Sequence, residues 1–490
     1  MKIAIVGGGS AGWLASLFLI SKFPEYEIMS VESADINPIG VGEATTGKFT
    51  QMLEQIGVDL LDFMKQTDAL PKHSIRLTNW TKTPGQFDSP VDYSTSYKDF
   101  FDKSLFLQLL DNRPIEYASQ SGIFSLLGKT SFKLNSQGQL EQLFPAALQF
   151  DAGRVVDFLK RTAIDRGVTH IVDTVSEVVL DHNKRITELR TPNRKIIADL
   201  YIDCTGFSRL LIGKLDPVMI NNSKYIHVNS AMLFRLPNDT LDRTTMLTIA
   251  RKHGWNFEIS TRNRIGRGYL FNKDLTTTDE LVQELSESYE QTVEPVRVLN
   301  WTPSRPKDVW IGNTIAIGLS ASFQEPLQAG SIHHTAIQLQ DLYESGINSQ
   351  MFDPTNVSAY NKRCQRMFND YVDFIGVSYA TDRDDSEFWN FVKHDQQLTD
   401  RAKEILDISH ARLTRDIDFD KFMGYCSQGI YNYTLAGLGH FDQQLIEKTF
   451  NSYGIDVEQL RQRQLQFEKD TMNLASQCLS MTELNDHLRQ

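Results

Sequence analysis

The first residues whose spacing could do chemistry form a glycine cluster near the N-terminus. The positions that we assign to cofactor binding are Gly7, Gly9, Ser10, Ala11 and Gly12. The three glycines match the pattern G-x-G-x-x-G, which permits a tight turn and a close approach of the backbone to a pyrophosphate. Amides at the N-terminus of the following helix attract phosphate charge. The cluster therefore predicts a dinucleotide-binding turn.

Glu32 is the second candidate, because it lies twenty residues after Gly12. Segments 2–6 and 27–32 have the β-branched composition of strands, so Glu32 is expected at the end of the second strand. An acidic residue at this point of such a unit hydrogen-bonds a ribose hydroxyl. The unit by itself does not distinguish FAD from NAD.

The elements that must position these residues follow from hydrophobic periodicity. Strands are predicted at 200–203 and 313–319, with a mainly antiparallel sheet between 224 and 298. A glycine-rich loop is predicted at 40–45. Helices are predicted at about 49–56, 154–165, 331–344, 357–375 and 457–476. This order predicts an α/β domain assembled from separated segments and followed by a helical region.

Composition excludes several classes of partner. The chain has 490 residues, 41% of them apolar, and a formal net charge of -12, which argues against binding to nucleic acid or to an anionic membrane. Four scattered cysteines are typical of reduced thiols, and the apolar run 13–20 is too short to span a bilayer. We therefore expect a cytoplasmic protein, and we leave its oligomeric state open, a homo-oligomer included.

Seven segments resemble, in order, the flavin-dependent tryptophan halogenase family. They include G-V-G-E-A-T at 40–45, K-H-S-I-R-L-T-N-W at 72–80 and D-C-T-G-F at 203–207. The others are 150–159, 254–260, 312–327 and 373–389. The likeness covers roughly residues 1–390, whereas residues 391–490 carry no motif that we can name.

The resemblance implies a fold class: an α/β, FAD-binding Rossmann-like (three-layer) domain with an antiparallel-sheet substrate region and a helical C-terminal region. Residues 1–220 and 300–350 would form the discontinuous FAD-binding core. Residues 70–148 and 221–299 would be substrate-region insertions. Residues 351–490 would be the mainly helical C-terminal region.

The resemblance also implies the cofactors. FAD would act as FADH2, with oxygen as co-substrate and a halide ion as the source of halogen. Further cofactor-binding positions are Gly42, Glu43, Ala44, Thr45, Gly318 and Leu319. Because a second G-x-G-x-x-G is not found, we expect FADH2 to be supplied by a separate flavin reductase.

By the same resemblance, Lys72 is the catalytic lysine. Hypohalous acid would reach its amine beside a small, electron-rich aromatic substrate of indole or phenol type. Trp255 and Phe257 would shield that substrate from the flavin. The family has a second Trp where this chain has Phe257 and a Pro where it has Ser260, but the aromatic bulk is kept.

The loop after E-P-L departs from the family. Gln328 stands where relatives have a catalytic glutamate, and an amide cannot act as a carboxylate base. Glu325, three residues earlier, is the candidate substitute, and the alternative is that Glu325 has a structural hydrogen-bond role. Gly330 and Ser331 are the expected backbone donors to halide. With the family's threonine hydroxyl lost and more room at Gly330, bromide or iodide is expected to be used better than chloride, whose hydration shell is tightest.

Two alternatives stay open at this point. One is a flavin-dependent monooxygenase that hydroxylates an aromatic substrate, and the other is a degenerate, non-catalytic flavin-binding sensor. No metal site is expected, because His333 and His334 are adjacent on a helix and point to different sides. Tyr379, Arg383 and Asp385 would line the substrate pocket, or they would belong to a solvated loop or a buried ion pair.

Overall fold

The computed structural model describes residues 1–35, 42–91, 98–237, 243–347, 351–419 and 428–489. A six-stranded sheet forms the end of the molecule that carries the glycine turn. In spatial order its strands are β10 (Thr169–Val172), β2 (Glu27–Glu32), β1 (Lys2–Val6), β14 (Leu200–Asp203), β23 (Thr314–Ala316) and β22 (Trp310–Ile311). All neighbours are parallel except β22 and β23.

Helices and a second small sheet pack against the six-stranded sheet. Helix α1 (Ser10–Lys22) contacts both α6 (Ala152–Asp165) and α8 (Gly330–Glu344). The small sheet is β11 (Glu177–Leu180), β12 (Ile186–Arg190) and β13 (Lys195–Ile196), and its apolar side chains join the same core. These three layers confirm the predicted Rossmann-like domain. The strand predicted at 313–319 is shorter, because a 3-10 turn, η5 (Gly318–Ser320), begins at Gly318.

A seven-stranded sheet forms the middle of the molecule. Its spatial order is β20 (Glu294–Asn300), β16 (Ser230–Arg235), β19 (Ile265–Phe271), β18 (Gly254–Ser260), β17 (Thr245–Arg251), β5 (Ser74–Thr78) and β6 (Gln86–Pro90). Antiparallel pairing dominates, as predicted for 224–298. The exception is the parallel pair β5–β17. Helix α7 (Thr278–Tyr289), which begins at a capping box on Thr277, also lies within the predicted run of strands.

A three-stranded sheet links the two larger sheets. Strand β9 (Ala147–Asp151) pairs with β3 (Gly42–Ala44) on one side and with β4 (Leu70–Lys72) on the other. The prediction of a loop was therefore wrong for residues 42–44, because backbone pairing with β9 extends them. Residues 40 and 41 lie outside the described residues. Strand β3 also contacts β18 and β19 of the seven-stranded sheet.

The rest of the chain is mainly helical. The helices predicted at 357–375 and 457–476 are α9 (Pro354–Ser378) and α14 (Val457–Ser476). Further helices are α2 (Gly47–Gln55), α3 (Leu60–Thr67), α4 (Lys98–Leu110), α5 (Gln120–Leu126), α10 (Glu387–Asn390), α11 (Asp400–Ala411), α12 (Gln428–Gly437), α13 (Gln443–Ser452) and α15 (Met481–Arg489). The short strands are β7 (Phe132–Leu134), β8 (Leu140–Gln142), β15 (Met219–Asn221) and β21 (Ser304–Pro306).

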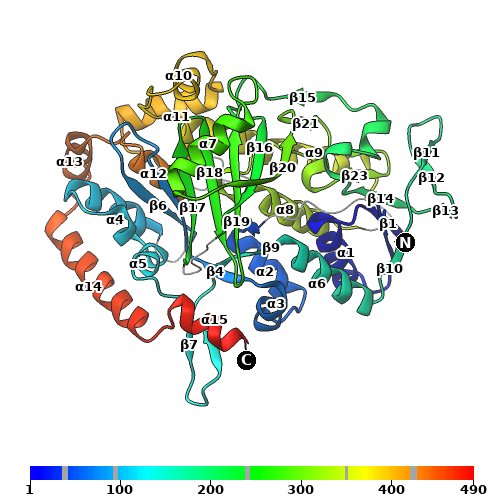
Figure 1. Ribbon diagram of the computed structural model, residues 1–490, viewed down its shortest axis with the longest axis horizontal. Helices are drawn as coiled ribbons and strands as arrows, with labels where there is room; N and C mark the ends of the chain where they lie inside the picture. Colours follow the sequence, from blue (N-terminus) through cyan, green and yellow to red (C-terminus); the bar gives the residue numbers. More distant parts are fainter. Residues whose placement is uncertain (36–41, 92–97, 238–242, 348–350, 420–427, 490) are drawn as a thin grey trace.

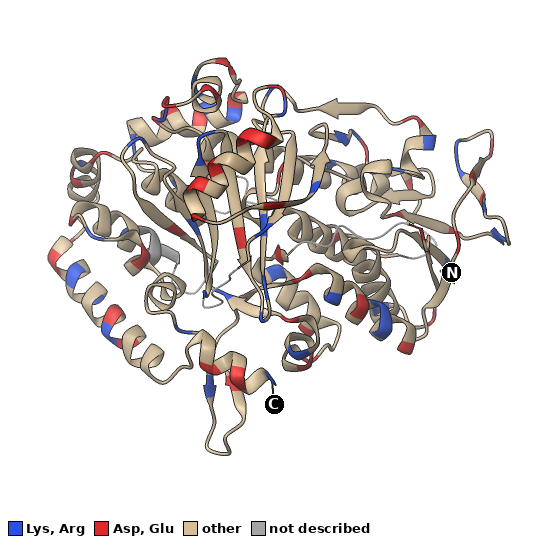
Figure 2. Cartoon of the chain, viewed as in Figure 1, with Lys and Arg blue, Asp and Glu red and all other residues tan. Residues whose placement is uncertain are grey.

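Figure 1 shows β1 and α1 at one end of the molecule, strands β16 to β19 in the middle, and α13 and α14 at the other end. Helix α14 packs on α4 and α5, although these segments are far apart in sequence. Figure 2 shows both signs of charge spread over the outer helices. In the described part of the chain, no helix is long and apolar enough to cross a membrane.

Two hydrophobic cores meet near β3. The first lies around the six-stranded sheet and includes Trp13 and Phe150, and the second lies between the seven-stranded sheet and the C-terminal helices. Trp255, Tyr379 and Ala44 belong to the second core. The short sheet therefore places cofactor-side residues against the aromatic core.

Candidate active site

The glycine turn follows β1 and is shaped by contacts that leave no room for side chains. A Cβ atom added at Gly7 would lie 2.2 Å from the carbonyl oxygen of Cys204, and one added at Gly12 would lie 1.9 Å from that of Gly7. Gly7 also has a φ of 126°, which favours glycine. An added Cβ at Gly9 would meet nothing within 4 Å. Two glycines thus allow tight packing, and Gly9 faces space that a pyrophosphate can approach.

Glu32 ends β2 beside this turn. Its carboxylate accepts hydrogen bonds from Trp13 Nε1 at 3.2 Å and from His170 Nε2 at 2.8 Å, and it forms an ion pair with Lys160. Burial alone would raise the pKa of Glu32, but the bonds from Lys160 and His170 outweigh it and lower the pKa. An ionised acceptor in this position suits the hydroxyls of a ribose. The spacing of residues in the sequence did not predict these contacts of Lys160 and His170.

The later cofactor-binding candidates meet the same turn. A Cβ added at Gly318 would lie 2.7 Å from the Cβ of Ala11, so η5 and α1 approach closely, and Leu319 follows half-buried in η5. Burial raises the pKa of Glu43 to about 7, and the neighbouring Ser10 side chain offsets this only in part. The structure therefore brings the residues of four separate segments together at one end of α1.

Strand β3 continues this cluster toward the middle of the molecule. Gly42 packs against Gly266, and the buried Ala44 joins the aromatic core. The Thr45 hydroxyl donates to the carbonyl oxygen of Leu148 and accepts from its amide. These contacts fix the strand that carries Glu43.

Lys72 ends β4 in a fully buried position. Its Nζ makes no hydrogen bond with any residue that the structure describes. Burial lowers the pKa of Lys72 to about 7, so a large fraction of the amine is neutral at neutral pH. Most lysines are solvated, and a buried unpartnered amine is costly unless it serves chemistry. Sequence periodicity alone did not distinguish this lysine from a surface one.

The three-stranded sheet separates Lys72 from the cofactor side. Lys72 pairs with Ala147 of β9, and Ala44 pairs with Gln149 on the opposite edge of β9. Because neighbouring strands lie about 4.8 Å apart, β3 and β4 are separated by roughly 10 Å across the sheet. Lys72 and the strand that carries Glu43 thus lie on opposite edges of the same small sheet.

Glu325 is buried and bonded through Tyr379 to the predicted shielding strand. Tyr379 Oη lies 3.1 Å from Glu325 Oε1 and accepts a hydrogen bond of 2.7 Å from Trp255 Nε1. Burial raises the pKa of Glu325 to about 8, which the bond from Tyr379 offsets only in part. Phe257 lies two residues from Trp255 on β18 and belongs to the same aromatic core. The structure thus joins Trp255 to Glu325, whereas Lys72 bonds to neither.

The loop after Glu325 has an uncommon backbone. Gln328 and Ala329 both have left-handed conformations, with φ of 60° and 62°, and Gly330 and Ser331 then begin α8. A Cβ at Gly330 would lie 2.7 Å from the ring of Tyr371, so only glycine fits there. The room that the sequence predicted at Gly330 for a larger halide is therefore filled by this ring, and that part of the prediction was wrong. Consecutive amides in such a turn before a helix N-terminus form an anion-binding concavity.

The remaining candidate residues, two histidines and the Arg383–Asp385 pair, bond to or pack against other side chains of the fold. His333 Nδ1 bonds the Thr46 hydroxyl at 2.7 Å, and the His334 ring packs edge-on against Tyr371. Arg383 forms a two-pronged ion pair with Asp385, which agrees with the ion-pair interpretation. No group of three or more metal-binding side chains occurs within the described ranges.

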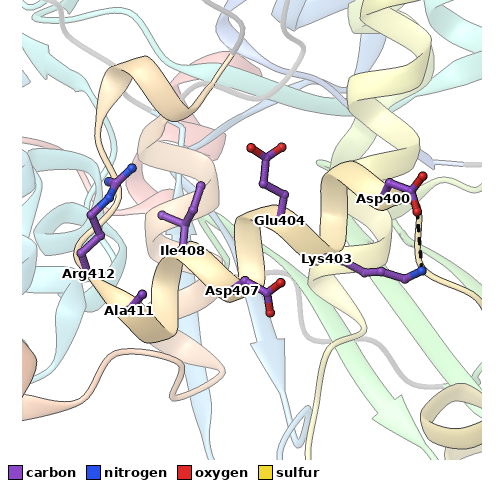
Figure 3. A pocket seen from close by; sticks show the side chains of 7 residues that line it. All are labelled: Asp400, Lys403, Glu404, Asp407, Ile408, Ala411 and Arg412. Carbon is purple, nitrogen blue, oxygen red and sulfur yellow. Dashed lines mark ion pairs between the residues drawn. The ribbon is translucent and has the colours of Figure 1, made fainter.

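A cavity of about 490 Å³ lies elsewhere, on one face of α11 (Figure 3). Its lining residues are Asp400, Lys403, Glu404, Asp407, Ile408, Ala411 and Arg412. Side chains of α11 and of Arg412, just after the helix, line this open pocket, and none of the candidate residues above contributes to its wall. We therefore assign it no role in the reaction.

The glycine turn, the ribose-side acid and the buried amine define a dinucleotide-dependent α/β enzyme, and sequence comparison specifies the family. The family described as "Tryptophan halogenase" matches residues 2–448. Tryptophan 7-halogenase KtzQ of Kutzneria sp. is 30% identical over 80% of this chain and 78% of its own length. Tryptophan 7-halogenase RebH of Lentzea aerocolonigenes is 28% identical over 89% of both.

Structural comparison agrees on the fold. A solved structure of a tryptophan halogenase from Shewanella frigidimarina superposes with a TM-score of 0.91 at 24% identity, covering 100% of this chain and 98% of that one. The chain therefore belongs to the tryptophan halogenase family. It is an enzyme of the flavin-dependent halogenase class, an oxidoreductase whose family uses FAD, halide and oxygen.

Proposed function

We propose that this enzyme uses FADH2, oxygen and halide to halogenate a small, electron-rich aromatic of indole or phenol type through hypohalous acid and Lys72. The observation that carries the proposal is the Lys72 amine, which is fully buried, unbonded to any described residue and of lowered pKa. A neutral amine is a nucleophile, whereas a surface lysine at neutral pH is protonated.

The reaction at Lys72 requires no reactant other than hypohalous acid and the aromatic substrate. The nitrogen lone pair takes the halogen from hypohalous acid, and the hydroxide leaves with an amine proton as water. Transfer of the halogen to the aromatic carbon then replaces a ring proton, which returns to the amine. Alternatively the amine holds intact hypohalous acid by a hydrogen bond. Both routes require a water-poor site, which the burial of Lys72 supports.

The residues around α1 suit FAD. Gly9 and the α1 N-terminus would receive the pyrophosphate, Glu32 a ribose, and β3 with η5 the remainder of the cofactor. Reduced FAD with oxygen supplies the oxidising equivalents that convert halide to hypohalous acid. Because the pKa of Glu43 is raised to about 7, roughly half of this carboxyl is neutral at pH 7, which lessens its repulsion of a phosphate.

The turn at 328–331 would hold the halide. Amides of Gly330 and Ser331 are the proposed donors, and the left-handed Gln328–Ala329 pair turns the backbone ahead of them. Gln328 offers an amide in place of a carboxylate, so we propose that Glu325 takes the acid–base role. Its raised pKa makes it mainly a proton donor at neutral pH. We propose a preference for bromide or iodide over chloride.

Trp255 and Phe257 would keep the aromatic substrate apart from the flavin, which favours halogenation over hydroxylation. We further propose that a separate reductase supplies FADH2, since one dinucleotide fingerprint is found in the sequence. The reduced cysteines and acidic surface are consistent with a cytoplasmic setting.

The test supplies FAD, a flavin reductase, NADH, oxygen and mixed halides with a panel of indoles and phenols. Mass spectrometry should find halogenated products that require bromide or iodide and disappear without the reductase. Hydroxylated products independent of halide would favour a monooxygenase instead. Rapid reduction of the bound FAD by NADPH alone would contradict the need for a reductase.

A further inference from the structure

The C-terminal end of α9 holds the 325–330 loop through two tyrosine hydroxyls. Tyr371 Oη lies 2.7 Å from the carbonyl oxygen of Glu325 and 2.6 Å from that of Leu327. Tyr379, the C-cap of α9, donates instead to the Glu325 carboxyl group. One tyrosine therefore fixes the loop backbone, and the other contacts its buried acid.

The direction of the hydrogen bonds along Trp255, Tyr379 and Glu325 is determined by their chemistry. An indole N–H can only donate, so Tyr379 Oη must accept the 2.7 Å bond from Trp255. The single tyrosine proton is then left for Glu325, at 3.1 Å from Oε1. If Glu325 is protonated, Tyr379 donates its hydrogen bond to the carbonyl oxygen of the acid. The acid proton can then be donated to another group.

Aromatic packing restricts Tyr379 to this arrangement. The His227 ring is stacked on the Tyr379 ring with centroids 4.1 Å apart and planes inclined by 17°. Trp80 contacts the same ring edge-on at 5.2 Å, and Trp389 lies 6.3 Å away. All four rings are buried, so rotation of the tyrosine would require repacking of the core.

We infer that Tyr379 is a positioning residue, which orients the Glu325 carboxyl group and couples it to Trp255 of the shielding strand. This inference rests on the proposed function of Glu325 and Trp255. As a consequence, the shielding strand and the halide loop are held in a fixed position relative to each other. Tyr379 acts through Glu325 and is not assigned contact with the substrate.

The electrostatic surroundings of Glu325 are simple. Burial raises its pKa, and the bond from Tyr379 is the one contact with a described residue that lowers it. Titratable groups on adjoining elements include Tyr371, which contacts the loop carbonyls, His227, which stacks on Tyr379, and His334, which packs edge-on against Tyr371. Burial lowers the pKa of His227 to about 3, so it is neutral at physiological pH.

The experiment measures the titration of Glu325 itself in the oxidised, FAD-bound protein. Infrared difference spectra between the parent and Glu325→Gln isolate this carboxyl group, which is then titrated in Tyr379→Phe and Tyr371→Phe. Tyr379→Phe should move the midpoint to higher pH, because the ionised form loses its donor. It should also lower kcat/KM for halogenation about tenfold and shift the pH profile in the same direction.

Tyr371→Phe is the matched control, because it removes a hydroxyl from the same helix and loop. It should leave the Glu325 midpoint in place and raise the KM for bromide. Trp255→Phe, which keeps the tyrosine, should move the midpoint upward by less and serves if Tyr379→Phe does not fold. An unchanged midpoint in Tyr379→Phe, or an equal shift in Tyr371→Phe, would overturn the inference. Absence of product from the parent would instead reject the proposed function, since the infrared titration needs no turnover.

Discussion

The glycine turn and the aromatic side of the molecule are built by different means. The glycine turn, residues 7–12, is shaped by backbone atoms that leave less than 2.5 Å for an added Cβ at two positions. The aromatic side, which we define as Lys72, Trp255, Glu325 and Tyr379, consists of buried side chains from four separated segments. A larger residue at either of these two positions of the turn should therefore clash with the backbone and abolish FAD binding. A substitution on the aromatic side should instead change the reaction in a protein that still folds.

Gly12→Ala should give the largest effect of all. The added Cβ would collide with the Gly7 carbonyl oxygen, a backbone atom that cannot move without β1. We expect loss of FAD binding and of soluble yield, measured by flavin fluorescence titration and thermal melting. Gly9→Ala is the control: it should melt like the parent but bind FAD at least tenfold more weakly. Equal FAD affinity in Gly9→Ala would show that the pyrophosphate does not approach this position.

Lys72→Ala should leave a folded flavoprotein that no longer halogenates. We expect product formation to fall at least a hundredfold, the usual scale for a lost catalytic group, while FADH2 reoxidation by oxygen continues. Lys65→Ala, at an exposed lysine of α3, provides the matched control. A selective substrate is needed, because leaked hypohalous acid halogenates nonselectively. Undiminished, regioselective product from Lys72→Ala would remove Lys72 from the mechanism.

Gln328→Glu should shift halide choice toward chloride. Restoring a carboxylate beside the anion turn should strengthen activation of the least easily oxidised halide, so the chlorinated share should rise several-fold, up to about tenfold. Competition among equal chloride, bromide and iodide, with a peroxide scavenger present, measures this share. Gln139→Glu, on an exposed hairpin, controls for added charge. Dominant chlorinated product from the parent itself would show that this loop does not set the preference.

Lys72→Met should stabilise the protein in a pH-dependent way. The pKa of Lys72 is lowered from 10.5 to about 7 by burial, so below pH 7 the folded protein bears the full cost of a buried charge. As pH rises from 7 to 10.5 that cost is relieved, because the unfolded chain then holds more protons than the folded one. The gain in melting temperature should be on the order of 5 °C below pH 7 and should vanish near pH 10.5. A gain that is constant with pH would indicate packing alone.

Sequence patterns predicted the elements around the glycine turn well because these elements are local in sequence. The turn, β1, α1 and Glu32 occupy one continuous segment. The backbone geometry of that segment explains why each of these residue types is needed there. The aromatic side was predicted through family likeness, and its key contacts were not: nothing in spacing joins Trp255 to Tyr379 or Glu325. The extended conformation of 42–44 was also missed, since it depends on pairing with β9. The division into domains stays a prediction.

The parallel pairing of β5 with β17 has a consequence for how the chain folds. Ser74 lies opposite Thr245, so the middle sheet cannot close until 171 further residues have been synthesised. At roughly 5–20 residues per second, strand 74–78 can pair with β6 but lacks its second partner for about ten seconds or more of synthesis. Contacts between such distant residues also slow folding of the finished chain. We therefore expect refolding to be slow and yield to depend on chaperones, with the N-terminal βα unit protected from hydrogen exchange before the middle sheet.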